Sequence, residues 1–515
     1  MAVALPVQQY LRFVIRKFSN SSISRTLSGI SSASTQFRLA TVAQQPATDH
    51  KSPRPPSPPV IKPQVFRSNK PYELYKHDAP FKMHLGGELP SFEIAYESWG
   101  KMNERKDNVI LLTTGMSDSS HAKSHYGNRQ DGWWEKFIGP GLPLDTEKFH
   151  IICTNSLGGC YGSTGPASIN PATGNRYATD FPLVTVWDIA RTQFRLLDSL
   201  GVERAHAVVG SSMGGMTSLA VAALYPHRVG RIVSISAAAR SHPYSIALRH
   251  AQRQVLMSDI NWKDGKYYDG EPPQKGLNLT REFIPQLARQ IGTITYRSGP
   301  EWEIRFGRKR VDPKSKQGLS TDFMIESYLD HQGKKWRYDA NSFLYLSRAM
   351  DMFDMSDRLD FDTNNDTKHI LHESVHNFRD KEDKNVTDYT HTHHLTKGMS
   401  TIKCPVLVIG VKSDFLIPSW QQKEIATCLK AAGNNMVTHF EIDGVYGHDT
   451  FLLDFSNIGS AVKGHLEIDF EDSLIPIFNS FSRFDIGNGA DAFGRPDNIF
   501  GASLQQAERD GAKDV

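Results

Sequence analysis

One serine stands in a pattern that is typical of a nucleophile. Ser212 lies between Gly210 and Gly214, after an apolar run and before an alanine-rich one. Glycines on both sides permit the sharp strand-to-helix turn that lifts a serine hydroxyl above a sheet, and the backbone N–H of Met213 then faces the group under attack. Because a serine hydroxyl is a weak nucleophile at neutral pH, it needs a base and an acid that orients the base.

Candidates for both groups follow later in the chain. Asp414 comes after the apolar run 406–410, and His448 comes after the short alternating run 439–442, so each follows an expected strand. The order Ser, Asp, His, with each residue beyond the C-terminal end of a strand, is that of the α/β-hydrolase fold. We therefore predict a catalytic triad of Ser212, Asp414 and His448.

A loop after an early strand is the expected source of a second oxyanion donor, opposite the N–H of Met213. Here that loop covers residues 113–122, where Gly115 lets the backbone approach a substrate closely. We predict that Gly115 and Met213 form the oxyanion hole, and Met116 is the alternative to Gly115.

Two other motifs compete with this serine. Cys160 lies in a glycine-rich stretch, but the sequence places no base for it. His372-Glu373-Ser374-Val375-His376 matches a zinc-binding pattern. Its flanks are highly charged, it has no apolar face to bury a helix, and no third ligand is evident. We expect a solvated loop there, and neither a metal nor another cofactor in the site.

The elements that would position the triad alternate between strands and helices. Expected strands cover 92–97, 109–113, 150–154 and 232–236, besides the strand before Ser212, and an expected helix covers 186–200. This alternation predicts a mostly parallel, doubly wound sheet. We assign residues 67–239 and 396–475 to this α/β core.

The alternation stops between the two parts of the core. Residues 240–360 are mostly of helical character, with amphipathic stretches at 281–297, 322–331 and 342–353. Because this block lies between two core strands, it must emerge above the triad, and we interpret it as a helical lid domain. Residues 361–395 read as an exposed polar insertion, and residues 476–515 as a C-terminal tail.

The beginning of the chain differs in composition from the rest. Residues 1–45 carry arginines and many serines, and no acidic residue precedes Asp49. This composition is typical of a mitochondrial transit peptide, and the alternative is an unstructured tail. Residues 46–66 are a proline-rich linker, which neither pairs in a sheet nor continues a helix. We therefore expect a mitochondrial protein.

Composition narrows the classes of partner. The 515 residues have a formal net charge of +3, which gives no reason to expect a nucleic acid or an acidic membrane as a partner. The four cysteines form no Cys-x-x-Cys pair, so we expect reduced thiols. No run approaches eighteen consecutive apolar residues, and we expect no membrane span.

Six blocks together carry a resemblance to a known family. They are Leu157-Gly158-Gly159-Cys160-Tyr161-Gly162-Ser163-Thr164-Gly165-Pro166, Gly210-Ser211-Ser212-Met213-Gly214-Gly215, Gln252-Arg253-Gln254, Glu326-Ser327-Tyr328-Leu329 with Gln332-Gly333, Asp339-Ala340-Asn341-Ser342 with Arg348-Ala349-Met350-Asp351, and Gly447-His448-Asp449-Thr450-Phe451-Leu452. Over about 67–470 the chain resembles the homoserine/serine O-acyltransferase family of the α/β-hydrolase superfamily.

The resemblance implies a reaction and its partners. It implies transfer of an acyl group from an acyl-CoA co-substrate to L-homoserine or L-serine, through an acyl-serine intermediate in a ping-pong mechanism. It also implies a lid over a deep tunnel and a homodimer formed through the lids. Asp449 matches the family's ligand for the acceptor's amine. Arg289 matches its ligand for the carboxylate, and Arg281 is the substitute if an apparent insertion shifts the alignment.

The chemistry of these residues agrees with an amino-acid acceptor. A zwitterion needs an anion for its ammonium and a fork-shaped cation for its carboxylate, which Asp449 and Arg289 supply. The leader, the linker and the polar insertion resemble the fungal mitochondrial branch of serine O-acyltransferases of cysteine synthesis, so serine is our first choice. L-Homoserine, as in an O-acetyltransferase of methionine synthesis, is the alternative, and an esterase or thioesterase comes after it. The choice between acetyl-CoA and succinyl-CoA stays open.

Overall fold

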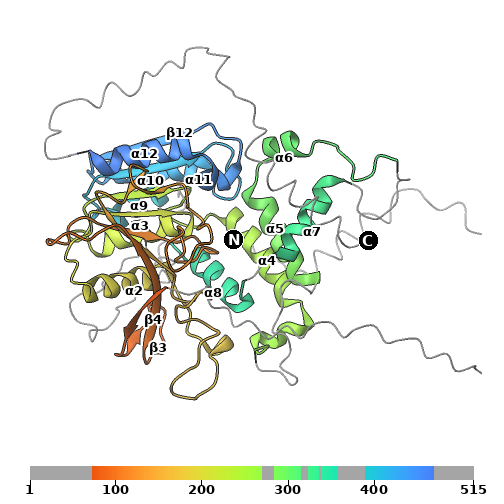
Figure 1. Ribbon diagram of the computed structural model, residues 1–515, viewed down its shortest axis with the longest axis horizontal. Coiled ribbons are helices and arrows are strands. Elements are labelled where there is room, and N and C mark those ends of the chain that lie inside the picture. Colours follow the sequence, from red (N-terminus) through yellow and green to blue (C-terminus); the bar gives the residue numbers. More distant parts are fainter. Residues whose placement is uncertain (1–71, 269–282, 315–322, 336–337, 357–388, 469–515) are drawn as a thin grey trace, which may run out of the picture. The chain divides into compact units, whose positions relative to one another are not determined.

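A large sheet organises the chain around the candidate triad. The computed structural model describes residues 72–268, 283–314, 323–335, 338–356 and 389–468, all in one structural unit. Among them an eight-stranded sheet has the order β1-β4-β8-β5-β9-β10-β11-β12 (Figure 1). Its strands are Glu73–His77 (β1), Phe92–Trp99 (β4), Val109–Thr113 (β5), His150–Thr154 (β8), Ala207–Ser211 (β9), Ile232–Ile235 (β10), Val406–Val411 (β11) and Val437–Ile442 (β12).

The strands from β8 to β12 are parallel, and β4 and β1 extend the sheet in antiparallel fashion. The carboxyl ends of parallel strands meet at one edge, where α/β proteins bind their ligands. Ser212, Asp414 and His448 follow β9, β11 and β12, so the sheet brings them to that edge. This confirms the mostly parallel sheet of the α/β-hydrolase fold that the sequence predicts.

Residues of the central strands alternate between two cores. In β5, Val109 and Leu111 pack in one apolar cluster, whereas Ile110 and Leu112 pack in the other. A period of two sends neighbouring side chains to opposite faces of a sheet, and strands covered on both faces are apolar throughout. The central strands therefore form a rigid platform that is buried on both sides.

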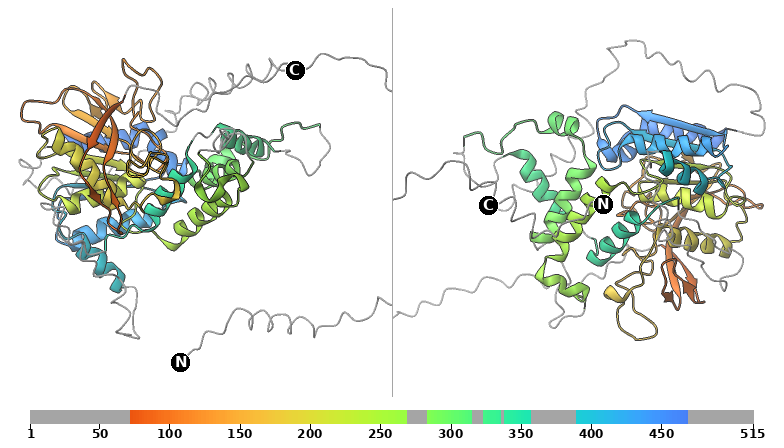
Figure 2. Two further views of the ribbon diagram at one scale, coloured as in Figure 1. Left: turned by 90° about the horizontal axis from the view of Figure 1, so that it is seen from below. Right: turned by 180° about the vertical axis from the view of Figure 1, so that it is seen from behind.

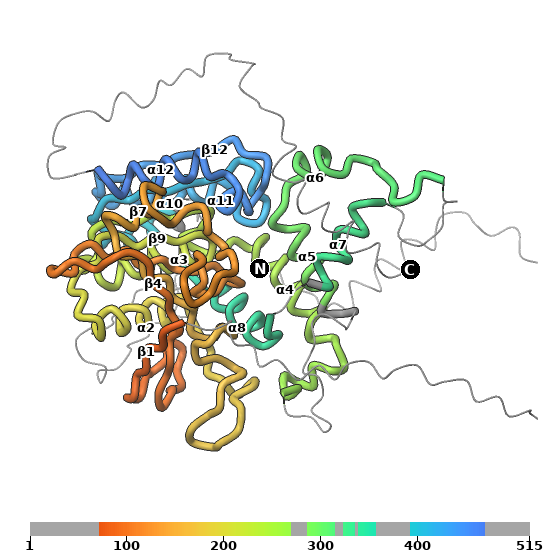
Figure 3. Tube along the Cα trace, in the orientation of Figure 1, coloured from red at the N-terminus to blue at the C-terminus, as the bar shows by residue number. Residues whose placement is uncertain are grey.

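Helices cover these two faces. Apolar residues of α2 (Val186–Ser199), α3 (Met213–Leu224) and α10 (Ser419–Ala431) belong to the first cluster, and those of α12 (Phe455–Glu467) belong to the second. Helix α2 begins with a capping box, in which the Thr185 side chain accepts from the Asp188 N–H and the Asp188 carboxylate accepts from the Thr185 N–H. Figure 3 follows the chain from β1 to α12.

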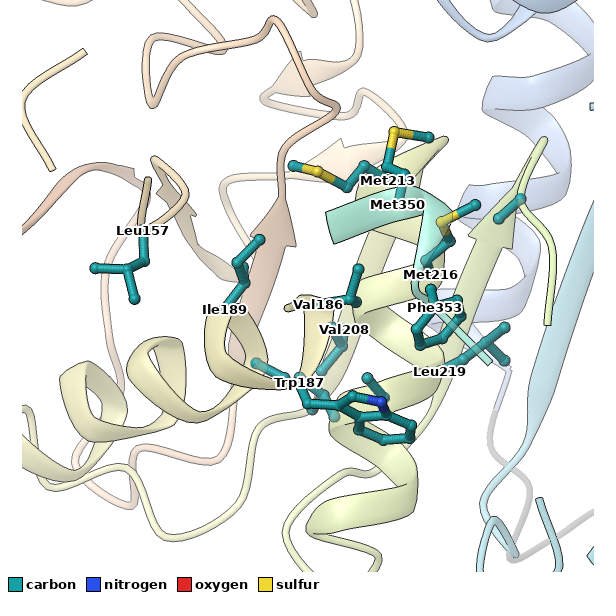
Figure 4. Close-up of a cluster of buried hydrophobic side chains, with 14 of the residues drawn as sticks. Leu157, Val186, Trp187, Ile189, Val208, Met213, Met216, Leu219, Met350 and Phe353 are labelled. Carbon is teal, nitrogen blue, oxygen red and sulfur yellow. The ribbon is translucent and has the colours of Figure 1, made fainter. Parts of the chain in front are cut away.

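The first cluster joins the helix after Ser212 to a distant segment. Figure 4 shows Met213 and Met216 of α3 near Met350 and Phe353, with Trp187 of α2 below them. The rings of Trp187 and Phe353 have centroids 5.6 Å apart. The end of the predicted lid is therefore part of the main core, and it packs directly against the helix that carries the serine turn.

The segment between β10 and β11 is helical where the structure describes it. It contains α4 (Pro243–Met257), η2 (Ile260–Gly265), α5 (Phe283–Tyr296), α6 (Gly299–Arg305), α7 (Met324–Lys335) and α8 (Ala340–Asp351). Helix α5 packs against both α4 and α7, and the two views of Figure 2 show these three helices side by side. The three amphipathic stretches that the sequence predicts correspond to α5, α7 and α8.

The described residues also form shorter elements. They are the strand pairs Phe81–Lys82 (β2) with Glu88–Leu89 (β3) and Ile138–Gly139 (β6) with Leu144–Asp145 (β7), and the helices Ala178–Asp180 (η1), Tyr389–Gly398 (α9), Gly447–Asp449 (η4) and Thr450–Leu453 (α11). Helix α9 begins inside the stretch that we interpreted as a polar insertion, so the last residues of that stretch are helical. None of the described helices combines the length and the apolar character that crossing a bilayer requires.

Several predictions fall on residues outside the described ranges. These are the transit peptide, the proline-rich linker, the C-terminal tail, most of the polar insertion with its His372 to His376 motif, and Arg281. The four cysteines are all described and free, in agreement with the expected reduced thiols.

Candidate active site

Ser212 stands in a strained turn between β9 and α3. Its φ of 56° and ψ of −124° lie in a region that residues with a side chain rarely adopt. Such a conformation needs firm support, which the Ser212 N–H provides by donating to the Ile235 carbonyl at 2.9 Å. The turn is the nucleophile elbow that the sequence predicts.

The two flanking glycines are required by close packing. A Cβ on Gly214 would lie 2.2 Å from the Thr113 carbonyl oxygen, and a Cβ on Gly210 would lie 2.2 Å from Thr113 Oγ1. Thr113 Oγ1 also donates to the Gly214 carbonyl at 2.8 Å, which fixes the end of β5 to the start of α3. Glycine therefore lets the elbow sit directly on the strand that leads into the predicted oxyanion loop.

His448 is held by Asp414. His448 Nδ1 lies 2.6 Å from Asp414 Oδ2, and both side chains are buried. Asp414 Oδ1 accepts the Ile417 N–H at 2.8 Å, so the carboxylate cannot turn away. This arrangement places the proton of the neutral ring on Nδ1 and leaves Nε2 as the basic nitrogen.

The Nε2 atom of His448 is buried and makes no hydrogen bond to a described residue. A buried polar atom of this kind is expected to have a partner when the site is occupied, and a substrate or nucleophile hydroxyl would supply one. Burial opposes a charge on the ring, but Asp414, with smaller contributions from Asp449 and Asp118, raises the pKa of His448 above its ordinary value. The ring is therefore suited to take up a proton.

Hydrogen bonds in the oxyanion loop distinguish Gly115 from Met116. The N–H of Gly115 donates to Asp118 Oδ2 at 3.1 Å, so it is already used inside the loop and is a poor candidate for an oxyanion donor. The next residue, Met116, is held by its carbonyl, which accepts the Tyr338 hydroxyl at 2.7 Å. The N–H of Met213 lies in the first turn of α3, where backbone donors have no acceptor within the helix. We therefore favour Met116 over Gly115.

Arg289 and Asp449 lie in one electrostatic cluster beside His448. The charges of Arg289 and His448 both lower the pKa of the Asp449 carboxyl, although burial outweighs them and raises it. The guanidinium of Arg289 also lies over the ring of Tyr296, 5.1 Å from its centroid. The structure thus places a cation and an anion near the basic histidine, as an amino-acid acceptor requires.

A second arginine in this cluster was missed by the sequence analysis. Arg297 NH2 lies 3.1 Å from Asp449 Oδ2, and Arg297 NH1 donates to Glu301 Oε1 at 2.8 Å. Arg297 follows Arg289 by about two helical turns, which puts both side chains on the same side of the end of α5. This spacing was a signal in the sequence, but only the fold reveals Asp449 as the partner.

The lid approaches the histidine loop closely at this point. Gly447 has a φ of 66°, and a Cβ on it would lie 2.9 Å from the Arg297 carbonyl carbon. The Ser298 hydroxyl donates to the Val445 carbonyl in the same loop. The junction of α5 and α6 therefore packs against the segment that carries His448. A movement of the lid would displace this segment and change the position of the base.

Two further features are a cysteine thiol, Cys160, and a group of side chains of the types that bind metals. Burial strongly raises the pKa of the Cys160 thiol, which keeps it protonated and a poor nucleophile. Ligand atoms of Glu97, His121 and His125 lie within 4.8 Å of one another, the arrangement among the described residues that most resembles a metal site.

Hydrogen bonding argues against a metal in this group. His125 Nδ1 accepts the Gly127 N–H, so the proton is on Nε2, which faces Glu97 Oε2 at 2.9 Å. A ligating nitrogen must be unprotonated. Both nitrogens of His121 face acceptors, Glu97 Oε2 and the Gln130 carbonyl, and the Glu97 hydrogen bond raises the pKa of His121. The group is therefore a buried carboxylate held by histidines, which anchors the loop that follows β5.

The geometry is suited to acyl transfer to a charged acceptor. A serine nucleophile, an oriented histidine and backbone donors suit attack on an acyl carbonyl. The cation and the anion beside them would hold a zwitterion, for which an enzyme that releases acyl groups to water has no need.

Comparisons with known proteins agree with this site. Residues 108–455 match the family described as alpha/beta hydrolase fold. The chain is 51% identical over 428 residues to a serine O-succinyltransferase of Emericella nidulans, covering 77% of this chain and 81% of the relative. It is 44% identical over 502 residues to a serine O-succinyltransferase of Schizosaccharomyces pombe, covering 88% of this chain and 97% of the relative.

A solved structure gives the same result. The homoserine O-acetyltransferase from Bacillus anthracis superposes with a TM-score of 0.64 at 26% identity, over 78% of this chain and 98% of that one. The chain is therefore an acyltransferase and belongs to the homoserine/serine O-acyltransferase family of the α/β-hydrolase superfamily.

Proposed function

We propose that the protein transfers an acyl group from acyl-CoA to the hydroxyl of L-serine. The observation that carries this proposal is the position of Arg289 and Asp449 beside a His448 that Asp414 orients. The similarity to fungal proteins named serine O-succinyltransferase supports serine as the acceptor and succinyl-CoA as the donor.

In the first half-reaction, His448 Nε2 takes the proton of the Ser212 hydroxyl, and Ser212 Oγ attacks the thioester carbonyl. The N–H groups of Met213 and Met116 would stabilise the oxyanion that forms. Collapse of this intermediate breaks the carbon–sulfur bond, and the CoA thiolate leaves with the proton from His448. The acyl group is then esterified to Ser212.

In the second half-reaction, His448 removes the proton of the acceptor hydroxyl, which attacks the acyl-Ser212 ester. Arg289 would hold the acceptor's carboxylate, and Asp449 would contact its ammonium group. The O-acyl amino acid leaves, and Ser212 recovers its proton from His448. Water is disfavoured as the acceptor because it makes neither charged contact.

L-Homoserine is the second candidate acceptor, because a homoserine O-acetyltransferase has a similar structure. It differs from serine by one methylene, which is worth only about 1–3 kcal/mol of discrimination. Steady-state kcat/KM values for both acceptors, each with succinyl-CoA and with acetyl-CoA, test the proposal. Serine with succinyl-CoA should give the highest value, and a higher value for homoserine would reverse the assignment.

Release of CoA without an acceptor separates this reaction from hydrolysis. A transferase should release about one equivalent of CoA as Ser212 is acylated and should then stop until serine is added. Steady CoA release in the absence of any amino acid would identify an esterase or thioesterase. In Ser212→Ala, mass spectrometry of the active-site peptide should show no acyl increment.

We further propose a mitochondrial homodimer. The composition of residues 1–45 supports import, and the family resemblance supports pairing through the lids. Deletion of residues 1–45 should leave the activity intact and the protein in the cytosol, and continued mitochondrial delivery would refute the import signal. Light scattering of the purified protein tests the dimer.

A further inference from the structure

Asp118 is a carboxylate of the oxyanion loop for which the reaction described above has no role. Its Oδ2 accepts the Gly115 N–H, and a Cβ on Gly115 would lie 2.6 Å from the same oxygen. The side chain is therefore folded back onto the start of the loop at Gly115. A Cβ on Gly115 would also lie 3.9 Å from the Ser211 carbonyl oxygen, so the residue that Asp118 contacts lies beside the serine turn, and Asp118 itself is half-buried.

The surroundings of Asp118 are those of the acceptor site. The charges that act on it belong to Asp449, His448 and Arg289, the three groups assigned to the second half-reaction. Burial raises the pKa of Asp118 and the charge of Asp449 adds to this shift, whereas the Gly115 hydrogen bond, His448 and Arg289 oppose it, and the pKa is about 6. The carboxylate is thus ionised above pH 6, beside a second carboxylate.

The two carboxylates differ in how their charge is balanced. Asp449 forms an ion pair with Arg297. Among the described residues, Asp118 receives only the Gly115 N–H and has no cationic nitrogen within ion-pair distance. Two anions that repel each other in a partly buried site gain most from a cation that reaches both. The acceptor of the proposed reaction carries one, its ammonium group.

We propose that Asp118 is a specificity-determining residue that binds the ammonium group of the amino-acid acceptor together with Asp449. The inference rests on the proposed function and adds a residue to its acceptor site. Arg289 takes the carboxylate, and the two aspartates take the amine from the oxyanion loop and from the histidine loop. Because Asp118 also accepts the Gly115 N–H, acceptor binding would fix the position of Gly115 and of the neighbouring Met116 during the second half-reaction.

Acceptors that lack one charged group test this inference. The variant is Asp118→Asn, because asparagine can still accept the Gly115 N–H and loses only the charge. Asp131→Asn, a change at an exposed residue further along the same segment, is the matched control. The acceptors are L-serine, 3-hydroxypropionate, which lacks the amine, and ethanolamine, which lacks the carboxylate. Discharge of acyl-Ser212 is measured in single turnovers.

With Asp118→Asn, acylation by acyl-CoA should proceed at the normal rate. Discharge should slow about tenfold or more with serine and with ethanolamine, the range expected for loss of a charged hydrogen bond. Discharge with 3-hydroxypropionate should not change. Arg289→Ala should show the reverse selectivity, with losses for serine and 3-hydroxypropionate only.

Equal losses with all acceptors, or a loss of acylation, would make Asp118 a residue that only positions the loop. Discharge by serine equal to the wild type would also overturn the inference. Asp118→Ala removes the contact with Gly115 as well as the charge. The loss of acylation rate in Asp118→Ala relative to Asp118→Asn therefore measures how much Asp118 contributes by holding the loop in place. If neither serine nor homoserine discharges the wild-type acyl-enzyme, the proposed function itself fails, irrespective of Asp118.

Discussion

Arg297 of the lid and Asp449 of the histidine loop form an ion pair, with 3.1 Å between NH2 and Oδ2. Both side chains are mostly buried, so water screens the pair less than it would at the surface. Asp449 is the residue next to the base, and Arg297 directly follows α5, the helix that carries Arg289. One contact therefore links the lid, the acceptor's carboxylate ligand and the catalytic histidine.

Arg297→Gln should weaken acceptor binding and spare acylation. The cation that most strongly lowers the pKa of Asp449 would be lost, so this carboxyl would stay protonated to a higher pH. As the pH is lowered, the KM for serine should rise in both proteins. The rise should begin at a higher pH in the variant than in the wild type. Arg305→Gln is the control, because Arg305 contacts Glu301 but forms no ion pair with Asp449. Identical pH profiles for the two variants would contradict this role.

Arg289→Ala should separate the two half-reactions. Arg289 has no task while Ser212 attacks the thioester, so the acylation burst with acyl-CoA should keep its rate. Transfer to serine should fall by about tenfold or more, the value of a hydrogen bond between charged groups. Rapid-quench measurement of acylation beside steady-state transfer tests this. A collapse of acylation with a normal KM for serine would assign Arg289 to the donor site.

The pH dependence of acylation should report His448. The base works only when neutral, and Asp414 holds the pKa of His448 above its ordinary value, so the acylation rate should fall as the pH drops through that raised pKa. In Asp414→Asn the carboxylate charge is lost, so the acid limb should move to lower pH. The plateau rate should drop about 10³–10⁴-fold, because the ring loses its orientation. Asp443→Asn, at an exposed residue, should leave both unchanged.

The sequence predicted those parts of the site that depend on local rules. The elbow at Ser212 follows from two glycines beside a strand, and Asp414 and His448 follow from strand ends that a parallel sheet collects at one edge. The choice between Gly115 and Met116 depends on more than the local pattern, because the side chain of Asp118, three residues on, accepts the N–H of Gly115. Nothing in the local pattern distinguishes that aspartate from the serines around it.

Contacts between segments that are distant in the sequence could not be predicted from these local rules. Arg297 meets Asp449 only because the lid returns to the histidine loop, and Tyr338 meets the Met116 carbonyl across a still longer stretch of chain. Periodicity located the helices next to Arg297 and Tyr338, but it gives no register between a helix and a distant loop. The glycine at position 447 is required for a similar reason: a side chain there would clash with the backbone of Arg297 and Ser298, which are distant in the sequence.

Asp351 should be essential for the stability of the lid. It lies on α8 with 2% of its side chain exposed, and its two oxygens bind Arg249 Nε at 2.6 Å and Arg253 NH2 at 2.5 Å, both on α4. Asp351→Ala would leave two buried guanidinium groups without their shared anion. Loss of one partner of a buried ion pair costs about 3–5 kcal/mol. Urea unfolding followed by tryptophan fluorescence should show a drop of this size in the free energy of unfolding.

The control for this prediction is Asp443→Ala, which removes an ion pair with Lys412 in which both side chains are largely exposed. Its effect on unfolding should be small, because water solvates both charges once the pair is broken. A double replacement of Arg249 and Arg253 by methionine should recover part of the stability lost in Asp351→Ala, since it removes the unpaired charges and keeps the apolar volume. If Asp351→Ala unfolds like the control, α4 and α8 are held together by apolar packing instead.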